Sequence, residues 1–234
     1  MNHSINWKNK NDEGINNMEM TQADIKIPVN NNIYLDGILS IPKKASRIVL
    51  FVHGSGSSRL SVRNQYVANI LHKANIATLL FDLLTLSEDE VDAVTREYRF
   101  NISLLASRLI AVTDWILQQP ITHDCLLGYF GASTGGAAAL CAAAKKQDVV
   151  KAVVSRGGRP DLAGELLSEV IAPTLLIVGG HDEPVIEMNQ NAMLQMHCIK
   201  KLEIVPGATH LFEEAGTLDE VAMVAKKWFL NYLK

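Results

Sequence analysis

The strongest constraint on the fold is a series of short apolar segments in which polar and apolar residues do not alternate. These segments are RIVLFV, IATLLF, CLLGYFG, VVKAVV and PTLLIV, and stretches of helix length separate most of them. A strand without alternation is buried on both faces, which requires a parallel sheet covered by helices on both sides. The sequence therefore predicts an α/β fold with a doubly wound, mostly parallel sheet of about eight strands.

The N-terminal part of the chain follows a different pattern. Residues 1–20 are rich in Asn and charged side chains without a sustained period, so we expect a disordered leader there. After it, IKIPV and IYLDGILSIP flank the asparagines at 30–32, which predicts an antiparallel hairpin. We expect 21–234 to form a single domain, because no repeat or linker interrupts it. The expected helices cover 61–74, 90–119, 134–146, 185–198 and 217–233.

Charge and hydropathy argue against several classes of partner. The 234 residues include 22 basic and 25 acidic side chains, a net charge of −3, so nucleic acid and anionic membranes are not expected as partners. No apolar run approaches the roughly 20 residues that cross a bilayer, and residues 1–20 lack a signal-peptide core. We therefore predict a cytoplasmic protein, with its three cysteines as free thiols.

A candidate nucleophile lies in the segment GASTG at 131–135, which matches the motif G-x-S-x-G. The motif follows an expected buried strand and precedes a helix of small residues. Such a turn needs glycines because the backbone folds back sharply and exposes the serine, here Ser133. The alternative is a tight strand-to-helix turn that carries an inert serine.

A serine hydroxyl needs a base, and the base needs an acid that orients it. Asp182 follows the apolar run PTLLIVGG, and His210 follows KLEIVPG, so both come after expected strands. Because ligands bind at the carboxyl ends of parallel strands, Ser133, Asp182 and His210 are expected at one edge of the sheet. Glu183 is the alternative acid.

An acyl-transfer site also needs N–H donors for the oxyanion of its tetrahedral intermediate. The amide after the nucleophile, that of Thr134, is the first candidate. The turn HGSGSS at 53–58 supplies the second, through the Ser55 amide, because its glycines let the backbone approach closely. The phosphate-binding motifs G-x-x-x-x-G-K-[ST] and G-x-G-x-x-G are not matched by this turn.

Several charged residues after the expected strands are candidates for substrate binding. They are Arg59, Arg63, Arg156, Arg159 and Asp82. An arginine fork binds carboxylates well, but ion pairs within the protein would occupy the same donors. Asp82 would either contact the substrate or stabilise its turn. No motif for a metal or a cofactor accompanies these residues, so neither is expected.

The segments HGSGSS, FDLLT, GASTGG, SRGGRPDLAG, GGHDEPV and GATHLF resemble the α/β-hydrolase superfamily, and within it the dienelactone-hydrolase-like proteins. Dienelactone hydrolases proper carry a cysteine nucleophile, whereas this chain has Ser133. The resemblance therefore implies a generic serine esterase rather than the specific lactone enzyme. The chain also looks like the hydrolase-like portion that accompanies some phosphoribosyltransferases. It lacks the acidic pair and T-G phosphate loop of that enzyme type, which argues against a transferase.

These residues predict a serine hydrolase that cleaves a small ester or lactone through an acyl-enzyme. Two alternatives stay open: a non-catalytic binding module with this fold, and an acyltransferase or perhydrolase that uses the same triad. Only residues 156–172 separate two expected strands where relatives insert a cap, so we expect no large cap and an open site for short acyl groups. The expected partner is a small-molecule ester, with a homodimer left open.

Overall fold

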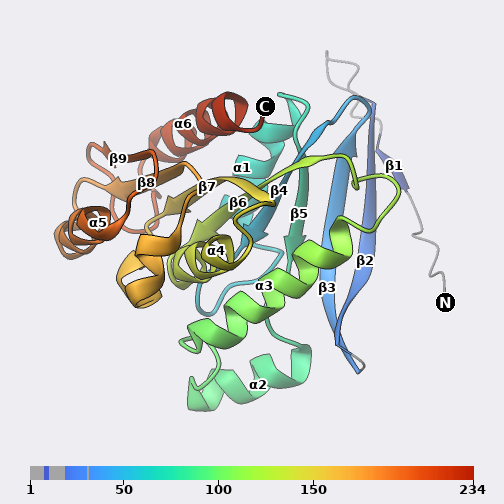
Figure 1. Cartoon of the computed structure of the whole chain (residues 1–234), viewed down its shortest axis with the longest axis horizontal. Helices are drawn as coiled ribbons and strands as arrows, with labels where there is room; N and C mark the ends of the chain where they lie inside the picture. The colour runs from blue at the N-terminus through green and yellow to red at the C-terminus, as the bar shows by residue number, and fades with distance from the viewer. Residues whose placement is uncertain (1–7, 11–18, 31) are drawn as a thin grey trace.

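The computed structural model describes residues 8–10, 19–30 and 32–234. Within them, nine strands form one sheet in the order β1-β2-β3-β5-β4-β6-β7-β8-β9 (Figure 1). The strands are β1 (Lys8–Lys10), β2 (Met20–Asn30), β3 (Ile33–Pro42), β4 (Arg47–Val52), β5 (Ala77–Phe81), β6 (Leu126–Ala132), β7 (Val150–Arg156), β8 (Thr174–Gly179) and β9 (Lys200–Val205). Apart from the three-residue β1, this is the eight-stranded sheet that the sequence predicts.

The pairing of the strands confirms the mixed topology. Strands β4 to β9 run parallel to one another, whereas β3 is antiparallel to β5 and β2 is antiparallel to β3. Every residue of β5 and of β8 is buried, because helices cover both faces of the sheet at these strands. The carboxyl ends of β4 to β9 therefore share one edge of the sheet, where a ligand site is expected.

Six α-helices and one 3₁₀ segment pack on the sheet. They are α1 (Val62–His72), α2 (Leu86–Thr95), α3 (Ile102–Ile116), α4 (Thr134–Lys145), η1 (Pro160–Glu169), α5 (Glu183–Gln195) and α6 (Thr217–Tyr232). Side chains of α1 and α6 fill the core on one face of the sheet, and those of α3, α4 and α5 fill the core on the other. Only η1 separates β7 from β8, so the described chain has no large cap at this position.

The expected helix over 90–119 is wrong, since the structure divides this region into α2 and α3. The break follows from Asp92, whose carboxylate accepts hydrogen bonds from the amides of Tyr98 and Arg99 at 2.8 and 2.9 Å. Arg96 ends α2 with a left-handed backbone at φ 60°. The buried carboxylate therefore organises a turn that the hydrophobic pattern does not reveal.

The N-terminal hairpin agrees with the prediction, and its turn is stabilised by an asparagine. The Asn30 side-chain oxygen accepts hydrogen bonds from the amides of Asn32 and Ile33 at 3.2 and 3.0 Å. Within the predicted leader, Lys8–Lys10 form strand β1 on the outer edge of β2. Strand pairing needs backbone groups and no apolar pattern, which is why composition does not indicate it. Residues 1–7 and 11–18 of the predicted leader lie outside the described residues.

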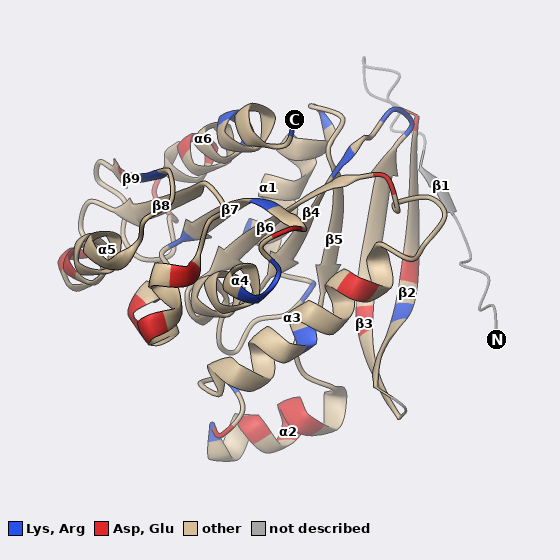
Figure 2. Cartoon of the chain, in the orientation of Figure 1, with Lys and Arg blue, Asp and Glu red and all other residues tan. Residues whose placement is uncertain are grey.

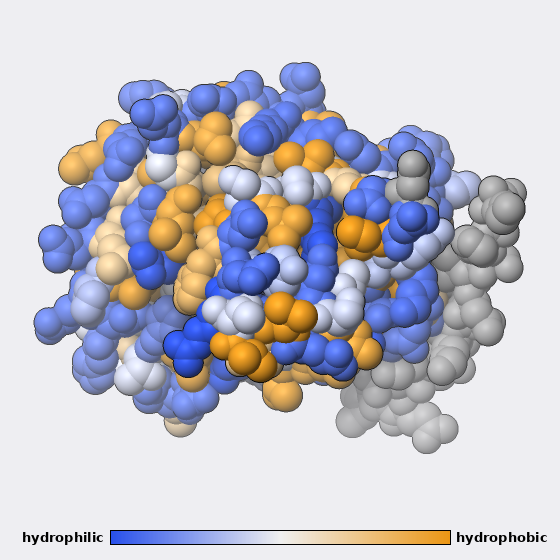
Figure 3. All heavy atoms as spheres, turned by 90° about the horizontal axis from the view of Figure 1, so that it is seen from below, coloured by the Kyte–Doolittle hydropathy of each residue, from blue (hydrophilic) through white to orange (hydrophobic). Residues whose placement is uncertain are grey.

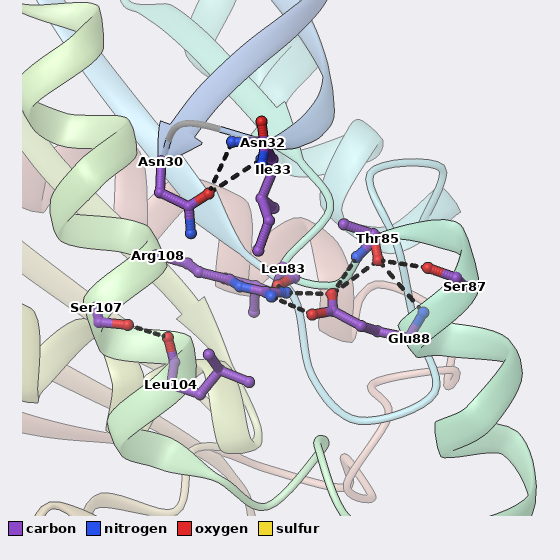
Figure 4. A network of polar contacts seen from close by, with 10 residues as sticks. All are labelled: Asn30, Asn32, Ile33, Leu83, Thr85, Ser87, Glu88, Leu104, Ser107 and Arg108. Carbon is purple, nitrogen blue, oxygen red and sulfur yellow. Dashed lines mark hydrogen bonds and ion pairs between the residues drawn. The ribbon is translucent and has the colours of Figure 1, made fainter.

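Helix α2 lies below the sheet in Figure 1, and several of its residues are acidic (Figure 2). Its first turn is tied to α3 by Glu88, whose carboxylate binds the guanidinium of Arg108, with one Nη1–Oε2 contact at 2.7 Å (Figure 4). Arg108 also donates to the carbonyl of Leu83 at 2.6 Å. This pair between the buried Arg108 and the half-buried Glu88 thus fixes α2 beside the carboxyl ends of the strands.

The surface on this side is mixed rather than uniformly polar. Leu86 and Val94 on α2 and Phe100 after it are 77%, 85% and 56% exposed. Figure 3 views the molecule from this side and shows apolar patches within a mostly hydrophilic surface. No helix of the described ranges is both long enough and apolar enough to cross a bilayer.

Candidate active site

Ser133 occupies the sharp turn between β6 and α4 and has a strained backbone. Its φ of 51° and ψ of −122° are unfavourable for a residue with a side chain and cost on the order of 1–3 kcal/mol. The flanking glycines make the turn sterically feasible. A Cβ on Gly131 would lie 2.5 Å from the carbonyl oxygen of Gly135, and one on Gly135 would lie 2.2 Å from that of Val52. The expectation of a glycine-dependent corner that exposes one serine agrees with this geometry.

The structure brings together the predicted base and acid. His210 Nδ1 lies 2.6 Å from Asp182 Oδ2, and Asp182 occupies the N-cap position of α5, shortly after β8. An Nδ1–H that donates to this carboxylate leaves Nε2 unprotonated and free to accept a proton. Glu183, the alternative acid, is exposed in the first turn of α5, and the hydrogen bond goes to Asp182 instead.

Ser133 and His210 are neighbours across one backbone segment, Arg156–Gly157. The amide of Ser133 donates to the Arg156 carbonyl at 3.1 Å. A Cβ on Gly157 would lie 3.4 Å from His210 Cε1, so the imidazole packs directly on the next residue of the same segment. No hydrogen bond joins the Ser133 hydroxyl to His210 among the described residues. Such contacts are often long without substrate and shorten when it binds.

The backbone amides of Ser55 and Thr134, the two predicted oxyanion donors, lie near the Ser133 turn. Gly54 precedes Ser55, and a Cβ on Gly54 would lie 3.0 Å from Ser133 Cβ, so this turn comes close to the candidate nucleophile. Thr134 begins α4, and its amide has no acceptor within the helix. The Ser55 and Thr134 hydroxyls are 3.1 Å apart, which fixes the two residues relative to each other. Within the described chain, no protein acceptor occupies either amide.

His53 is a structural residue of this turn. Its Nε2 accepts a hydrogen bond from the Leu83 amide at 2.9 Å, and its Nδ1 lies 2.9 Å from the Gly54 carbonyl. Burial lowers the pKa of His53 below its ordinary value, so the ring is neutral and can accept from Leu83. The imidazole thereby links the turn after β4 to the chain after β5.

A small cavity lies between the turn at 53–57 and the α2 region. Its lining includes Ser55, Leu83, Arg99, Leu105 and Thr134. The space left for the centre of a water-sized group is about 10 Å³, which is room for roughly one water molecule. The Ser55 hydroxyl donates to the Arg99 carbonyl at 3.3 Å, so the chain after α2 closes this side. Only a small group fits here without movement of α2.

Asp82 and Arg59 bind each other. Asp82 Oδ1 accepts a hydrogen bond from the Arg59 amide at 2.7 Å, and Oδ2 pairs with the Arg59 guanidinium. Asp82 thus stabilises the turn after β4, which is one of the two roles that the sequence left open for it. Arg159 is likewise occupied, because its guanidinium forms two hydrogen bonds to Asp161 at 2.9 and 2.7 Å.

Arg156 differs from these arginines because its buried guanidinium has no anionic partner in the described chain. Its side chain lies over the Phe212 ring, 5.8 Å from the centroid, and its Nε is buried without a hydrogen bond. Burial and the neighbouring charge of Arg63 lower the pKa of Arg156 to about 10, so it stays charged at neutral pH. A cation–π contact returns about 0.5–2 kcal/mol, whereas burial of an ion costs several kcal/mol. The Phe212 contact alone does not compensate that cost.

Arg63 is less buried than Arg156 and lies beside a surface hollow. The hollow has a volume of about 350 Å³ and is lined by Arg63, Tyr66, Phe212 and acidic residues after His210. Arg63 Nη1 lies 3.1 Å from Glu213 Oε1, while its Nε is buried without a partner. Of the predicted substrate-side residues, Arg63 and Arg156 therefore retain unsatisfied donors.

Two further residues hold the site together, and no sequence motif indicates either of them. Asn189 on α5 is fully buried, and its Nδ2 donates to the Gly158 carbonyl at 3.0 Å, which secures the turn after β7. Phe212 has a left-handed backbone at φ 56° and covers Arg156. The ion pairs around α2 are different, because the many charged residues at 87–99 indicate them in the sequence.

The described residues contain no group of three or more His, Cys, Asp or Glu side chains arranged to hold a metal ion. The groups near Ser133 combine its hydroxyl, an imidazole hydrogen-bonded to a carboxylate, and backbone amides without a protein acceptor in the described chain. This combination suits nucleophilic attack on a carbonyl group.

Comparison with known proteins identifies the family of the chain. The sequence profile of the dienelactone hydrolase family matches residues 68–233. The chain belongs to the dienelactone hydrolase family. It has the α/β-hydrolase fold of that family. A dienelactone hydrolase from Anabaena variabilis is 56% identical in sequence, and its crystal structure superimposes with a TM-score of 0.89. That likeness covers 91% of this chain and 98% of the other.

Other similar proteins differ in identity and in length. Est1E from Butyrivibrio proteoclasticus shares the fold, with a TM-score of 0.74 at 19% identity, over 89% of this chain and 98% of Est1E. Two Mycobacterium tuberculosis proteins, from strains CDC 1551 / Oshkosh and H37Rv, are 57% identical over 197 residues, and their names propose a phosphoribosyl transferase. The match covers 84% of this chain and 44% of each relative, so the chain spans less than half the length of these proteins.

Proposed function

We propose that this family member is a serine hydrolase that cleaves a small carboxylic ester or lactone. The observation that supports it most is the Asp182–His210 hydrogen bond of 2.6 Å beside a serine in a strained, glycine-flanked turn. A histidine held by a carboxylate is a general base, and a serine is inert without one. The strained turn keeps the Ser133 hydroxyl available for attack.

In the proposed reaction, Ser133 Oγ attacks the substrate carbonyl carbon while His210 Nε2 takes the hydroxyl proton. The negative charge on the former carbonyl oxygen is stabilised by the amides of Ser55 and Thr134. His210 then gives the proton to the leaving alcohol, and an acyl group remains on Ser133. Water attacks the acyl-enzyme with His210 again as base, which releases the acid and restores Ser133. Asp182 stabilises the imidazolium in both steps.

The small cavity beside Ser55 supports a short acyl group, because it leaves room for roughly one water-sized group. A longer acyl chain would have to displace α2, which is held by the Glu88–Arg108 pair. We therefore expect activity on aryl esters to fall as the acyl chain lengthens. Equal rates for acetyl and octanoyl esters would contradict the proposed acyl site.

Labelling with a fluorophosphonate probe tests the nucleophile directly. The wild-type protein is expected to be labelled, and Ser133→Ala is expected to lose the label. Ser107→Ala is a matched control, because Ser107 is an exposed serine on α3 whose hydroxyl donates to the Leu104 carbonyl at 2.8 Å. It should be labelled as strongly as the wild type. An unlabelled wild type would favour a binding module, and labelling without ester hydrolysis would favour acyl transfer or perhydrolysis.

We assign no phosphoribosyl transfer to this chain. The names of the M. tuberculosis proteins refer to chains more than twice as long as the matched part. Because their match covers 84% of this chain, it includes most of residues 68–233, which match the hydrolase family. Incubation with phosphoribosyl diphosphate and a nucleobase mixture should therefore leave the diphosphate intact.

A further inference from the structure

The parallel end of the sheet is an open edge. Strand β9 is the last strand in the order, and β8 is its only neighbouring strand in the described chain (Figure 1). At the opposite end of the sheet, the edge of β2 is covered by the short strand β1. An open edge presents unpaired backbone N–H and C=O groups, and these are a template for pairing with another strand.

The hydrogen bonds to β8 show which backbone groups of β9 are free. Consecutive residues of a strand direct their N–H and C=O groups to opposite sides. The carbonyl of Val205 accepts a hydrogen bond from the amide of Gly180 at 2.8 Å, and the register between β8 and β9 has no shift. The odd-numbered residues of β9 therefore bind β8. The backbone groups of Lys200, Leu202 and Ile204 point outward, and no hydrogen bond of the described chain uses them.

The side chains of β9 divide between the two faces of the sheet. Val205 packs in the core with α6, so the odd-numbered residues Lys201 and Glu203 share the α6 face. Leu202 and Ile204 lie on the other face, which α5 covers. Leu202 is half-buried, and Ile204 is 41% exposed. A second strand beside β9 would remove more of this apolar surface from water.

The two lysines of β9 are arranged so that they do not block the edge. Lysines on an edge strand commonly discourage pairing. Lys200 is turned toward α5, where its Nζ donates to the Met193 carbonyl at 2.7 Å and also to the Met196 carbonyl. Lys201 Nζ lies 2.5 Å from Glu203 Oε2, and the lysine side chain is 59% exposed. An exposed pair of this kind is weak, so both charges are available to another chain.

Antiparallel pairing with β9 of a second copy satisfies the backbone and the charges in one register. A two-fold axis at Leu202 places this residue opposite its own copy and places Lys200 opposite Ile204. Every outward backbone group then has a partner. On the α6 face, the same register places Lys201 opposite Glu203 of the second copy, and the symmetry repeats this pair.

The neighbouring registers are unfavourable because they oppose like charges. Outward groups meet outward groups only when one strand slides by an even number of residues. A slide of two residues in one direction places Lys201 opposite Lys201, and a slide in the other direction places Glu203 opposite Glu203. Like charges directly opposite each other destabilise a strand pair. The order of the two charges along β9 therefore selects the register centred on Leu202.

We propose that the protein forms a two-fold homodimer in which the β9 strands of two copies pair antiparallel, centred on Leu202, and join the two sheets into one. A closed two-fold pair covers the β9 edge of both copies and needs no third copy. The inference does not depend on the proposed ester hydrolysis, because none of the β9 side chains belongs to the candidate active site.

Sedimentation equilibrium of the full chain measures the association. We expect a dimer with a Kd in the micromolar range, as for an interface of small area. A protein that stays monomeric up to millimolar concentration would refute the proposal. A dimer whose Kd is unchanged by substitutions on β9 would place the contact elsewhere and refute it as well.

Reversal of single charges tests the register. Lys201→Glu places its new carboxylate opposite Glu203 of the second copy, and Glu203→Lys places two ammonium groups opposite each other. Each variant should therefore raise the Kd of its homodimer by about 10- to 100-fold. In an equimolar mixture of the two variants, opposite charges face each other again, so a heterodimer with a Kd near that of the wild type is expected.

A lysine at the far end of the sheet supplies the matched control for these variants. Lys26 on β2 is an exposed strand lysine whose Nζ lies 2.7 Å from Asp36 Oδ1. Lys26→Glu should leave the Kd of the dimer unchanged. A mixture of Lys201→Glu and Glu203→Lys that associates no better than either variant alone would contradict the register, as would an equal loss of association in Lys26→Glu.

A cysteine at the two-fold axis tests the same register without a change of charge. Opposite residues of a hydrogen-bonded antiparallel pair have Cα atoms about 5.5 Å apart, which suits a disulfide. Leu202→Cys should therefore form a disulfide-linked dimer on mild oxidation. Ile204→Cys should not, because Ile204 lies opposite Lys200 of the second copy, and the wild type supplies the background from its own three cysteines. Cross-linking of Ile204→Cys instead of Leu202→Cys would overturn the proposed pairing.

Discussion

Two regions border the candidate active site, and they treat buried charge in opposite ways. In the α2 region, Arg108 is paired with Glu88, and the almost fully buried Asp92 is paired with Arg99. Near Arg63 of α1, Arg156 at the end of β7 is buried without an anionic partner in the described chain. His72, on α1 itself, is also buried, and its only polar side-chain contact in the described chain is Thr78 Oγ1 at 2.7 Å.

The difference separates charges that join two segments of the fold from a charge that has no anionic partner in the described chain. A paired charge is satisfied within the protein and fixes the segments that the pair joins, as the half-buried Glu88 and the buried Arg108 fix α2 to α3 (Figure 4). A buried histidine can give up its proton, and burial lowers the pKa of His72 to about 4. Arginine cannot do so at neutral pH, and the charge of Arg156 therefore persists. We expect substitutions and pH changes in the two regions to reveal this difference.

The largest effect is expected for Asp182→Asn, in the candidate active site that the two regions border. The substitution removes the carboxylate that orients His210, so kcat for aryl ester hydrolysis should fall by about 10³- to 10⁴-fold. Steady-state kinetics with p-nitrophenyl acetate measures it. Glu183→Gln changes the adjacent exposed carboxylate and should have little effect. A fall of less than tenfold for Asp182→Asn would contradict the assigned acid.

In the α2 region, Glu88→Ala should lower the free energy of unfolding by about 3 kcal/mol, because it leaves Arg108 buried without an anion. Urea unfolding followed by circular dichroism measures the change. Glu90→Ala, at an exposed position on the same helix, should stay within about 0.5 kcal/mol of the wild type. A Glu88→Ala effect as small as that of the control would show that the pair is not a structural anchor.

Acid should destabilise the protein through His72. Its pKa of about 4 in the folded state lies below the ordinary value of 6.5, so the folded state favours the neutral ring. This contribution is complete above about pH 6.5 and is lost as the pH falls toward 4. Between pH 7.5 and 5 the free energy of unfolding should fall by about 2 kcal/mol from this residue.

Urea unfolding at the two pH values tests this, with His72→Gln expected to reduce the pH dependence by that amount. An identical pH dependence in the wild type and His72→Gln would refute the prediction. The lowered pKa of His53 acts in the same direction and should preserve part of the acid sensitivity in His72→Gln.

The smallest effect, and the most direct test of the comparison, is expected for Arg156→Met. Removal of an unpaired buried charge should leave the free energy of unfolding unchanged or raise it by about 1 kcal/mol. Glu88→Ala and Arg156→Met should therefore differ in the sign of their effects or by several kcal/mol. A loss of more than 1 kcal/mol for Arg156→Met would indicate that the guanidinium already has a stabilising partner.

Much of the fold follows from local patterns. Uninterrupted apolar segments require strands covered on both faces, so the mostly parallel sheet and its approximate number of strands are predictable from the sequence alone. The Ser133 turn is equally predictable, because only glycines at 131 and 135 permit the close approach. The break between α2 and α3 is not, because it depends on hydrogen bonds from Asp92 to residues six and seven positions later.

For the site, the sequence placed Ser133, Asp182 and His210 at the ends of strands, and the carboxyl ends of parallel strands always meet at one edge. It left the acid open between Asp182 and Glu183, and it treated Arg59, Arg63, Arg156 and Arg159 alike. Only the tertiary structure decided that Asp182 meets His210, that Arg59 and Arg159 are paired, and that Arg156 is not. The pattern of burial is encoded locally, whereas the partner of a charge depends on which distant segment packs beside it.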